Sequence, residues 1–203
     1  TRTPFGLLGV SADKLSGRCN DYVFQMSRLP LLTYDASDLQ QRALWDNIVA
    51  SRGKALDLTT PEGRLDGPFE AFVRRPDLGE HLIKVGGVIR FASSLEPRLL
   101  ELAITTVGAR WKSEFEFWAH SALALDAGID QSVIDALAAG ESPTFANDDE
   151  AAIYLYTLSL VTEGHVDQPI YDAVVAAVGV DSTVDLTHTI GYYSHISFVL
   201  NAF

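Results

Sequence analysis

The sequence predicts an all-α fold of about nine or ten helices. Apolar residues recur at helical spacing along most of the chain. No segment combines strict apolar–polar alternation with the turn residues that would indicate a strand. Proline and glycine stand at the two ends of many periodic segments, where they begin and end helices. The short connections between these segments favour antiparallel neighbours.

The length of 203 residues suits a single domain with an additional arm. Residues 1–35 are weakly patterned and contain Pro4 and Pro30, so we interpret them as an N-terminal arm. This arm would pack over the body or over a neighbouring subunit. Residues 36–203 are predicted to form one all-α domain.

The predicted helices follow one another with clear boundaries. Ser37 is a suitable cap for the first helix, which ends before Gly53, and residues 54–67 form a turn-rich loop. Pro68 and Pro76 each begin a further helix, the second running to about Ser93. The later helices are expected at 97–110, 113–128, 130–140, 148–164, 168–179 and 181–203, the last capped by Asp181 or Ser182.

Composition argues against several classes of partner. The formal net charge is −12, and no basic stripe offsets it, so neither nucleic acid nor an anionic membrane surface is expected. No stretch approaches the roughly 20 apolar residues that a membrane span needs. No signal peptide is recognisable, which favours a cytoplasmic location.

The chain has one cysteine, Cys19, in a polar segment beside Arg18. A single cysteine cannot form an intramolecular disulfide or support two-cysteine redox chemistry within one chain. We interpret Cys19 as an ordinary free thiol. A peroxidase-type antioxidant role through Cys19 between subunits is the weakest of the functional hypotheses.

Glu101 lies in the apolar segment LLELAITTV. If its carboxylate is buried, it needs a partner, because burying a lone charge is costly. Arg98, Glu101 and Thr105 could equally form one solvated helix face, since they are three and four residues apart. The pattern alone leaves both interpretations open.

Glu116 and His120 are four residues apart on the next predicted helix, so they share a face. The carboxylate could orient the imidazole or raise its pKa. Ser113 lies on the same face, and Trp118 is one of several aromatic neighbours. The set could form an acid–base pocket. The alternative is a surface ion pair on an amphipathic helix.

The last helix carries His188, Tyr192 and His195 on one face, with Tyr193 beside them. Such a stripe is more often part of a core or an interface than of a ligand site. A metal site formed by His120, His195 and a carboxylate is a further alternative, although no HExxH motif is present.

Three segments together resemble the carboxymuconolactone decarboxylase family, which includes the alkylhydroperoxidase D-like proteins. The first is GPFEAFVRRPDLGEHLIKVGGVIRFASSLEPRLLELAI, the second is WKSEFEFWAHSALALDAGIDQSVIDAL, and the third is HTIGYYSHISFVLNAF. The resemblance spans roughly residues 65–203. It implies an all-α bundle that assembles as an oligomer, with pockets near the subunit contacts.

The resemblance also implies roles for individual residues. In the peroxidase branch a glutamate, two cysteines and a histidine form a proton relay. The glutamate matches Glu101 and the histidine matches His120, whereas Ser113 and Glu116 occupy the cysteine positions. Peroxidase chemistry is therefore not expected, because serine cannot pass through sulfenic acid or a disulfide. The decarboxylase branch needs no cysteine and acts on a carboxylated lactone, for which Arg110 is a candidate binding cation.

We therefore expect a cofactor-free acid–base enzyme, of decarboxylase, other lyase or isomerase type, that acts on a small cyclic or carboxylated metabolite. It would use no metal and would form a homo-oligomer: a dimer, trimer or hexamer. The alternative is a degenerate family member that serves as a binding or assembly protein. The expected catalytic residues are Glu101, Glu116 and His120, with His120 as general acid/base, and the expected substrate-binding residues are Ser113, Trp118, Arg110, Tyr193 and His195.

Overall fold

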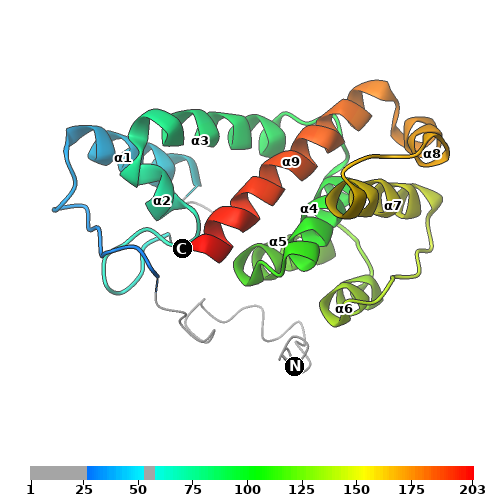
Figure 1. The fold of residues 1–203 in the computed structure, drawn as a ribbon, viewed down its shortest axis with the longest axis horizontal. Helices are drawn as coiled ribbons and strands as arrows, with labels where there is room; N and C mark the ends of the chain where they lie inside the picture. The colour runs from blue at the N-terminus through cyan, green and yellow to red at the C-terminus, as the bar shows by residue number, and fades with distance from the viewer. Residues whose placement is uncertain (1–26, 53–57) are drawn as a thin grey trace. The chain divides into compact units, whose positions relative to one another are not determined.

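The computed structural model describes residues 27–52 and 58–203, and this part of the chain is an all-α, multi-helix fold (Figure 1). Nine helices and no strand are present in it, as the periodicity predicted. The only extended pairing among these residues is an isolated antiparallel bridge between Thr59 and Leu65. Cys19 and most of the predicted N-terminal arm lie outside the described residues.

Every helical segment expected from the sequence is present. The helices are α1 (Leu39–Arg52), α2 (Phe69–Arg74), α3 (Pro76–Phe91), α4 (Pro97–Trp111), α5 (Glu114–Asp126), α6 (Gln131–Ala139), α7 (Asp148–Glu163), α8 (Gln168–Val178) and α9 (Val180–Ala202). Proline at the first helical turn begins α3, α4 and α8. Within the described ranges, none of these helices is both long enough and apolar enough to cross a membrane.

Two predicted caps are wrong. Ser37 does not cap α1, because its hydroxyl donates to the carbonyl of Thr33. Asp38 takes that role instead: its carboxylate accepts from the Gln41 amide N–H, and the Gln41 side chain accepts from the Asp38 N–H. At the other end of the chain, α9 already begins at Val180, so Asp181 lies inside its first turn.

The described residues form two compact units. One consists of residues 27–52, 58–93 and 198–203, and within it α1, α2 and α3 pack against one another. Gly79 sets the contact of α3 with the end of α2, because a Cβ atom there would lie 2.4 Å from the Phe72 carbonyl oxygen. The buried residues Leu44, Trp45 and Ile48 of α1 contribute to the core of this unit.

The second unit, residues 94–197, is arranged around α4. Helices α5, α6 and α7 pack directly on α4, and α8 packs on α7. Every residue of α4 from Leu99 to Gly108 is buried, which is typical of a helix surrounded by others. Glu101 and Thr105 are part of this buried stretch, so the alternative of a solvated face on α4 is wrong.

Candidate functional site

The tight connection between α4 and α5 places the candidate residues opposite one another. Lys112 ends α4 in the left-handed conformation, with φ at 54°. Its N–H donates to the Ala109 carbonyl, and the N–H of Ser113 donates to the carbonyl of Gly108. This pair of hydrogen bonds closes the end of a helix and reverses the chain within two residues. Helix α5 therefore returns along α4.

The same connection releases the side chain of Glu116. Ser113 and Glu116 have the spacing of a capping box, in which the glutamate would accept from the N–H of the serine. That N–H already donates to Gly108, and the Ser113 hydroxyl makes no capping hydrogen bond among the described residues. Glu116 is instead directed to His120, one turn further along α5.

Gly108 lets the two helices approach closely at this point. A Cβ atom at Gly108 would lie 3.0 Å from the amide nitrogen of Phe117 and 3.4 Å from the carbonyl carbon of Glu116. These are backbone atoms, which cannot move aside as a side chain can. The absence of a side chain at Gly108 is therefore required for the present separation of α4 and α5.

The centre of the site is an imidazole held between two carboxylates. His120 Nδ1 lies 2.7 Å from Glu101 Oε2, at hydrogen-bond distance, and His120 Nε2 lies 3.3 Å from Glu116 Oε2. All three residues are buried: Glu101 is 6% exposed, Glu116 is 4% exposed and His120 is 8% exposed. The alternative of a surface ion pair between Glu116 and His120 is therefore wrong.

The two carboxylates contact the imidazole differently. The Glu101 contact satisfies hydrogen-bond geometry, whereas Glu116 Oε2 is buried and has no hydrogen-bond partner among the described residues. The 3.3 Å separation is an ion-pair contact in which the atoms are close but poorly aligned for a hydrogen bond. Glu101 is thus the group that fixes the orientation of the ring.

Burial and the two carboxylates act on the pKa of His120 in opposite directions. Burial is the largest single influence and lowers the pKa, because it disfavours the charged ring. The hydrogen bond to Glu101 and the contacts with Glu116 together outweigh burial, so the pKa of His120 is raised. The surroundings of His120 therefore favour its protonated form more than water does.

One aromatic ring contacts this centre, and several buried hydroxyls lie close to it in the sequence. The ring of Tyr193 on α9 meets the His120 ring edge-on, with the centroids 5.0 Å apart. Ser113 is 1% exposed, and its hydroxyl has no hydrogen-bond partner in the described structure. The buried hydroxyls of Thr105 and Ser121 also lack a partner there. Sequence reasoning missed these two, although each is close in sequence to Glu101 or His120.

The other predicted substrate-binding residues lie differently. Arg110 is exposed and its guanidinium stacks over the ring of Trp111 at 5.2 Å. Trp118 packs against Phe115 and, being two residues from both Glu116 and His120, projects from the opposite side of α5. His195 is two residues from Tyr193 on α9, so it projects from a different side of that helix. Its Nε2 atom is buried and has no hydrogen-bond partner within the described ranges.

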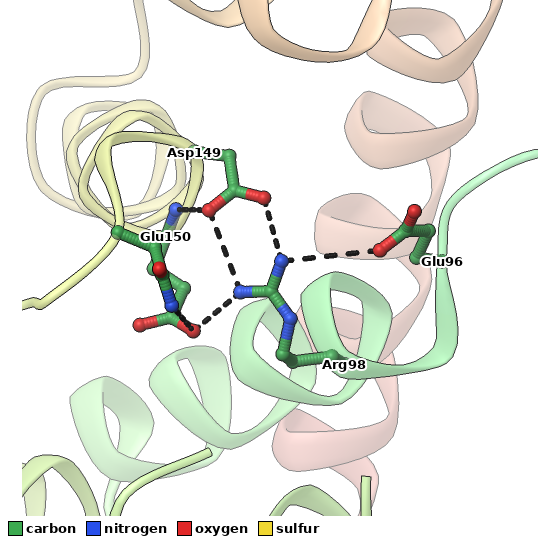
Figure 2. Close-up of polar contacts among 5 residues, drawn as sticks. Glu96, Arg98, Asp149 and Glu150 are labelled. Carbon is green, nitrogen blue, oxygen red and sulfur yellow. Dashed lines mark hydrogen bonds and ion pairs between the residues drawn. The ribbon is translucent and has the colours of Figure 1, made fainter. Parts of the chain in front are cut away.

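A second charged cluster holds the start of α4 against α7 (Figure 2). Arg98 forms a salt bridge with Glu150 and another with Asp149. In the second, Arg98 Nη2 lies 2.6 Å from Asp149 Oδ2. Glu96 lies 3.8 Å from the same guanidinium, and Asn147 donates to Glu150. Arg98 is one turn before Glu101, so this cluster anchors the part of α4 that carries the site. No short-range sequence signal pairs these residues, which are about fifty positions apart.

The described residues contain no group of three or more histidine, cysteine, aspartate or glutamate side chains arranged to hold a metal ion. A metal site formed by His120, His195 and a carboxylate is therefore not present in this part of the chain. No protein-family model matches the sequence, and no curated protein matches it significantly.

Proposed function

We propose that this protein is a cofactor-free acid–base enzyme of lyase or isomerase type, acting on a small cyclic or carboxylated metabolite. The observation that carries the proposal is the buried imidazole of His120 between the carboxylates of Glu101 and Glu116. A buried ionisable group whose pKa is shifted by nearby charged groups, as that of His120 is, is typical of sites that transfer protons.

The geometry supports a division of roles. Glu101 holds Nδ1 of His120 at 2.7 Å and thereby leaves Nε2 as the nitrogen that exchanges a proton. Glu116 lies beside Nε2 and can accept or return that proton. Since the pKa of His120 is raised, the resting enzyme would start as a general acid.

The resemblance to carboxymuconolactone decarboxylases supports the same proposal. The matched histidine is His120 and the matched glutamate is Glu101, and these two side chains are in contact. In this proposal Ser113 and Glu116, at the positions of the redox cysteines, bind substrate and transfer protons. The oligomer implied by the resemblance is part of the proposal.

A binding or assembly protein is the second candidate. The hydrogen bond between Glu101 and His120 would suit a purely structural network. Such a network would, however, also satisfy the buried Glu116 Oε2 and the Ser113 hydroxyl, and both lack hydrogen-bond partners among the described residues. These two groups favour a site that receives a ligand.

Deuterium exchange can test the proposal without knowledge of the substrate. The protein is incubated in D₂O with a panel of small cyclic ketones, lactones and keto acids, and deuterium incorporation at carbon is followed by NMR. We expect exchange of at least one compound by the native protein and a loss of about 100-fold or more in His120→Gln.

Glu114→Gln is the matched control, because Glu114 is an exposed carboxylate in the first turn of the same helix. It should retain the native exchange rate. Equal exchange by the native protein and the His120→Gln variant would overturn the proposal. Folding of each variant is checked by circular dichroism, so that a lost activity is not mistaken for a lost fold.

A further inference from the structure

The charges around the candidate site are very unevenly distributed along the chain. Residues 94–197 contain sixteen acidic residues but only three basic ones, Arg98, Arg110 and Lys112. The rest of the chain is nearly balanced, since the whole sequence has 27 acidic and 15 basic residues. Residues 94–197, which include Glu101, Glu116 and His120, therefore account for all of the net negative charge of the chain.

None of these three basic residues is placed to neutralise a substrate anion at His120. Arg98 is bound by Asp149 and Glu150 at the start of α7. Arg110 is exposed and stacked on Trp111, and Lys112 is exposed at the end of α4. Even with His120 protonated, the centre has two buried carboxylates and one cation, so a carboxylate or phosphate entering from solvent would be desolvated beside net negative charge, which is unfavourable.

The groups that lack partners indicate what the site does accept. Glu116 Oε2 is a buried acceptor that lies 3.3 Å from His120 Nε2 in an ion-pair contact but receives no well-aligned hydrogen bond among the described residues. Ser113 is the N-cap residue of α5, and its buried hydroxyl also has no hydrogen-bond partner in this part of the structure. An acceptor carboxylate calls for an N–H or O–H donor on the ligand, and a hydroxyl can complement either a donor or an acceptor.

Some buried hydroxyls on the helices of this protein are satisfied within their own helix, and others are not. Thr106, Thr183 and Thr189 each donate to the carbonyl four residues earlier, which satisfies them within their own helix. Thr105 and Ser121 are buried without such a hydrogen bond or any other among the described residues. Thr157 on α7 and Ser197 on α9 also lack a partner there, so an unpartnered hydroxyl does not by itself mark a ligand site.

We propose that the site selects an uncharged or protonated-amine substrate that donates a hydrogen bond to Glu116, and that it rejects carboxylated and phosphorylated molecules. This inference rests on the proposed function and narrows it. Of the metabolites considered there, it favours a cyclic compound with a hydroxyl or amino group over a carboxylated one, and isomerisation or ring opening over decarboxylation.

Three probes that share one ring test the selection: cyclohexylammonium, cyclohexanol and cyclohexanecarboxylate. Their affinities for the full-length protein are measured at pH 7 and 150 mM salt by ligand-observed NMR, together with the shift of the His120 ring resonances. We expect the ammonium and the alcohol to bind and to shift His120, and the carboxylate to bind about tenfold more weakly or not at all.

Glu116→Gln and Glu114→Gln separate the site from the general acidity of the surface. Both variants remove one negative charge from the first turn of α5, but only Glu116 is buried beside His120. We expect Glu116→Gln to weaken ammonium binding about tenfold and Glu114→Gln to change it less than twofold. Ammonium affinity that is equal in Glu116→Gln and the native protein overturns the proposal.

If Glu116→Gln does not fold, binding measurements on the native protein alone still test the proposed charge selection. Carboxylate binding as strong as that of the alcohol, or ammonium binding that leaves the His120 resonances unshifted, overturns the inference without any variant. Failure of the proposed function looks different: the charge selection holds, but no substrate shows exchange that depends on His120. Conversely, His120-dependent turnover of a carboxylated substrate retains the function and overturns the selection.

Discussion

His120 Nδ1 and Glu101 Oε2 lie 2.7 Å apart in the buried space between α4 and α5. This hydrogen bond joins two residues nineteen positions apart and leaves the other ring nitrogen, Nε2, facing Glu116. It also links the stability of the unit to the protonation of one histidine.

Replacing Glu101 by glutamine should lower the pKa of His120. The amide keeps the shape of the side chain and can accept a hydrogen bond, but it removes one of the two anions that favour the imidazolium. The loss of a charge-assisted hydrogen bond should cost about 2 kcal/mol of unfolding free energy below neutral pH. Histidine NMR titration measures the pKa, and urea denaturation measures stability. An unchanged His120 pKa would contradict the role given to Glu101.

The stability of the protein should depend on pH through His120. Because folding raises the pKa of this group, its contribution is complete below the unfolded pKa of about 6.5 and is lost as the pH rises through the folded pKa. The free energy of unfolding of the native protein should therefore fall relative to His120→Gln above pH 6.5. Parallel curves for the two proteins across this range would refute the prediction. Urea denaturation at a series of pH values provides the comparison.

Gly108→Ala and Gly191→Ala should have opposite effects on stability. At Gly108 the added methyl group meets backbone atoms of α5, so α4 and α5 must separate, at a cost of about 1–3 kcal/mol. At Gly191 nothing lies within 4 Å of the added atom, and alanine should stabilise α9 by up to about 1 kcal/mol. Thermal unfolding of the two variants gives the comparison. Equal effects would show that close helix contact at Gly108 is unimportant.

Arg98→Met should destabilise the unit by about 3 kcal/mol, because it leaves the buried carboxylate of Glu150 without its cation. Adding Glu150→Gln to this variant should restore part of the loss, since the uncompensated charge is then removed. A double-mutant cycle by urea denaturation measures the coupling. If adding Glu150→Gln lowers the free energy of unfolding further, the salt bridge in Figure 2 is not the main role of Arg98.

Lys112→Gly should stabilise the protein by about 1 kcal/mol. Lysine pays a steric cost in the left-handed conformation that it adopts here, and glycine does not. Lys112→Ala is the control: it removes the same charge and side chain but keeps the Cβ atom, so it should bring no such gain. Calorimetric unfolding of both variants distinguishes the backbone effect from a charge effect.

The sequence by itself determined the helices of this protein. Apolar residues at helical spacing predicted each helical segment, and prolines such as Pro76 and Pro97 marked where helices begin. These signals are local, because the periodicity and the first-turn preferences act within a few residues. The same locality placed Glu116 and His120 on one face, since they are four residues apart. Where two neighbouring residues could cap the same helix, as Ser37 and Asp38 could at α1, the predicted cap was wrong.

The tertiary structure alone decided which polar residues are buried and which of them meet. Local spacing could not distinguish a solvated Glu101 from a buried one, because its exposure depends on the helices that pack around α4. Nor could it pair Arg98 with Glu150, which are 52 positions apart. That Glu116 contacts His120 and does not cap α5 likewise follows from the turn at Lys112, which uses the N–H that a capping box would need. Burial and long-range contact are properties of the packed chain, and they turn a common helix pattern into a candidate site.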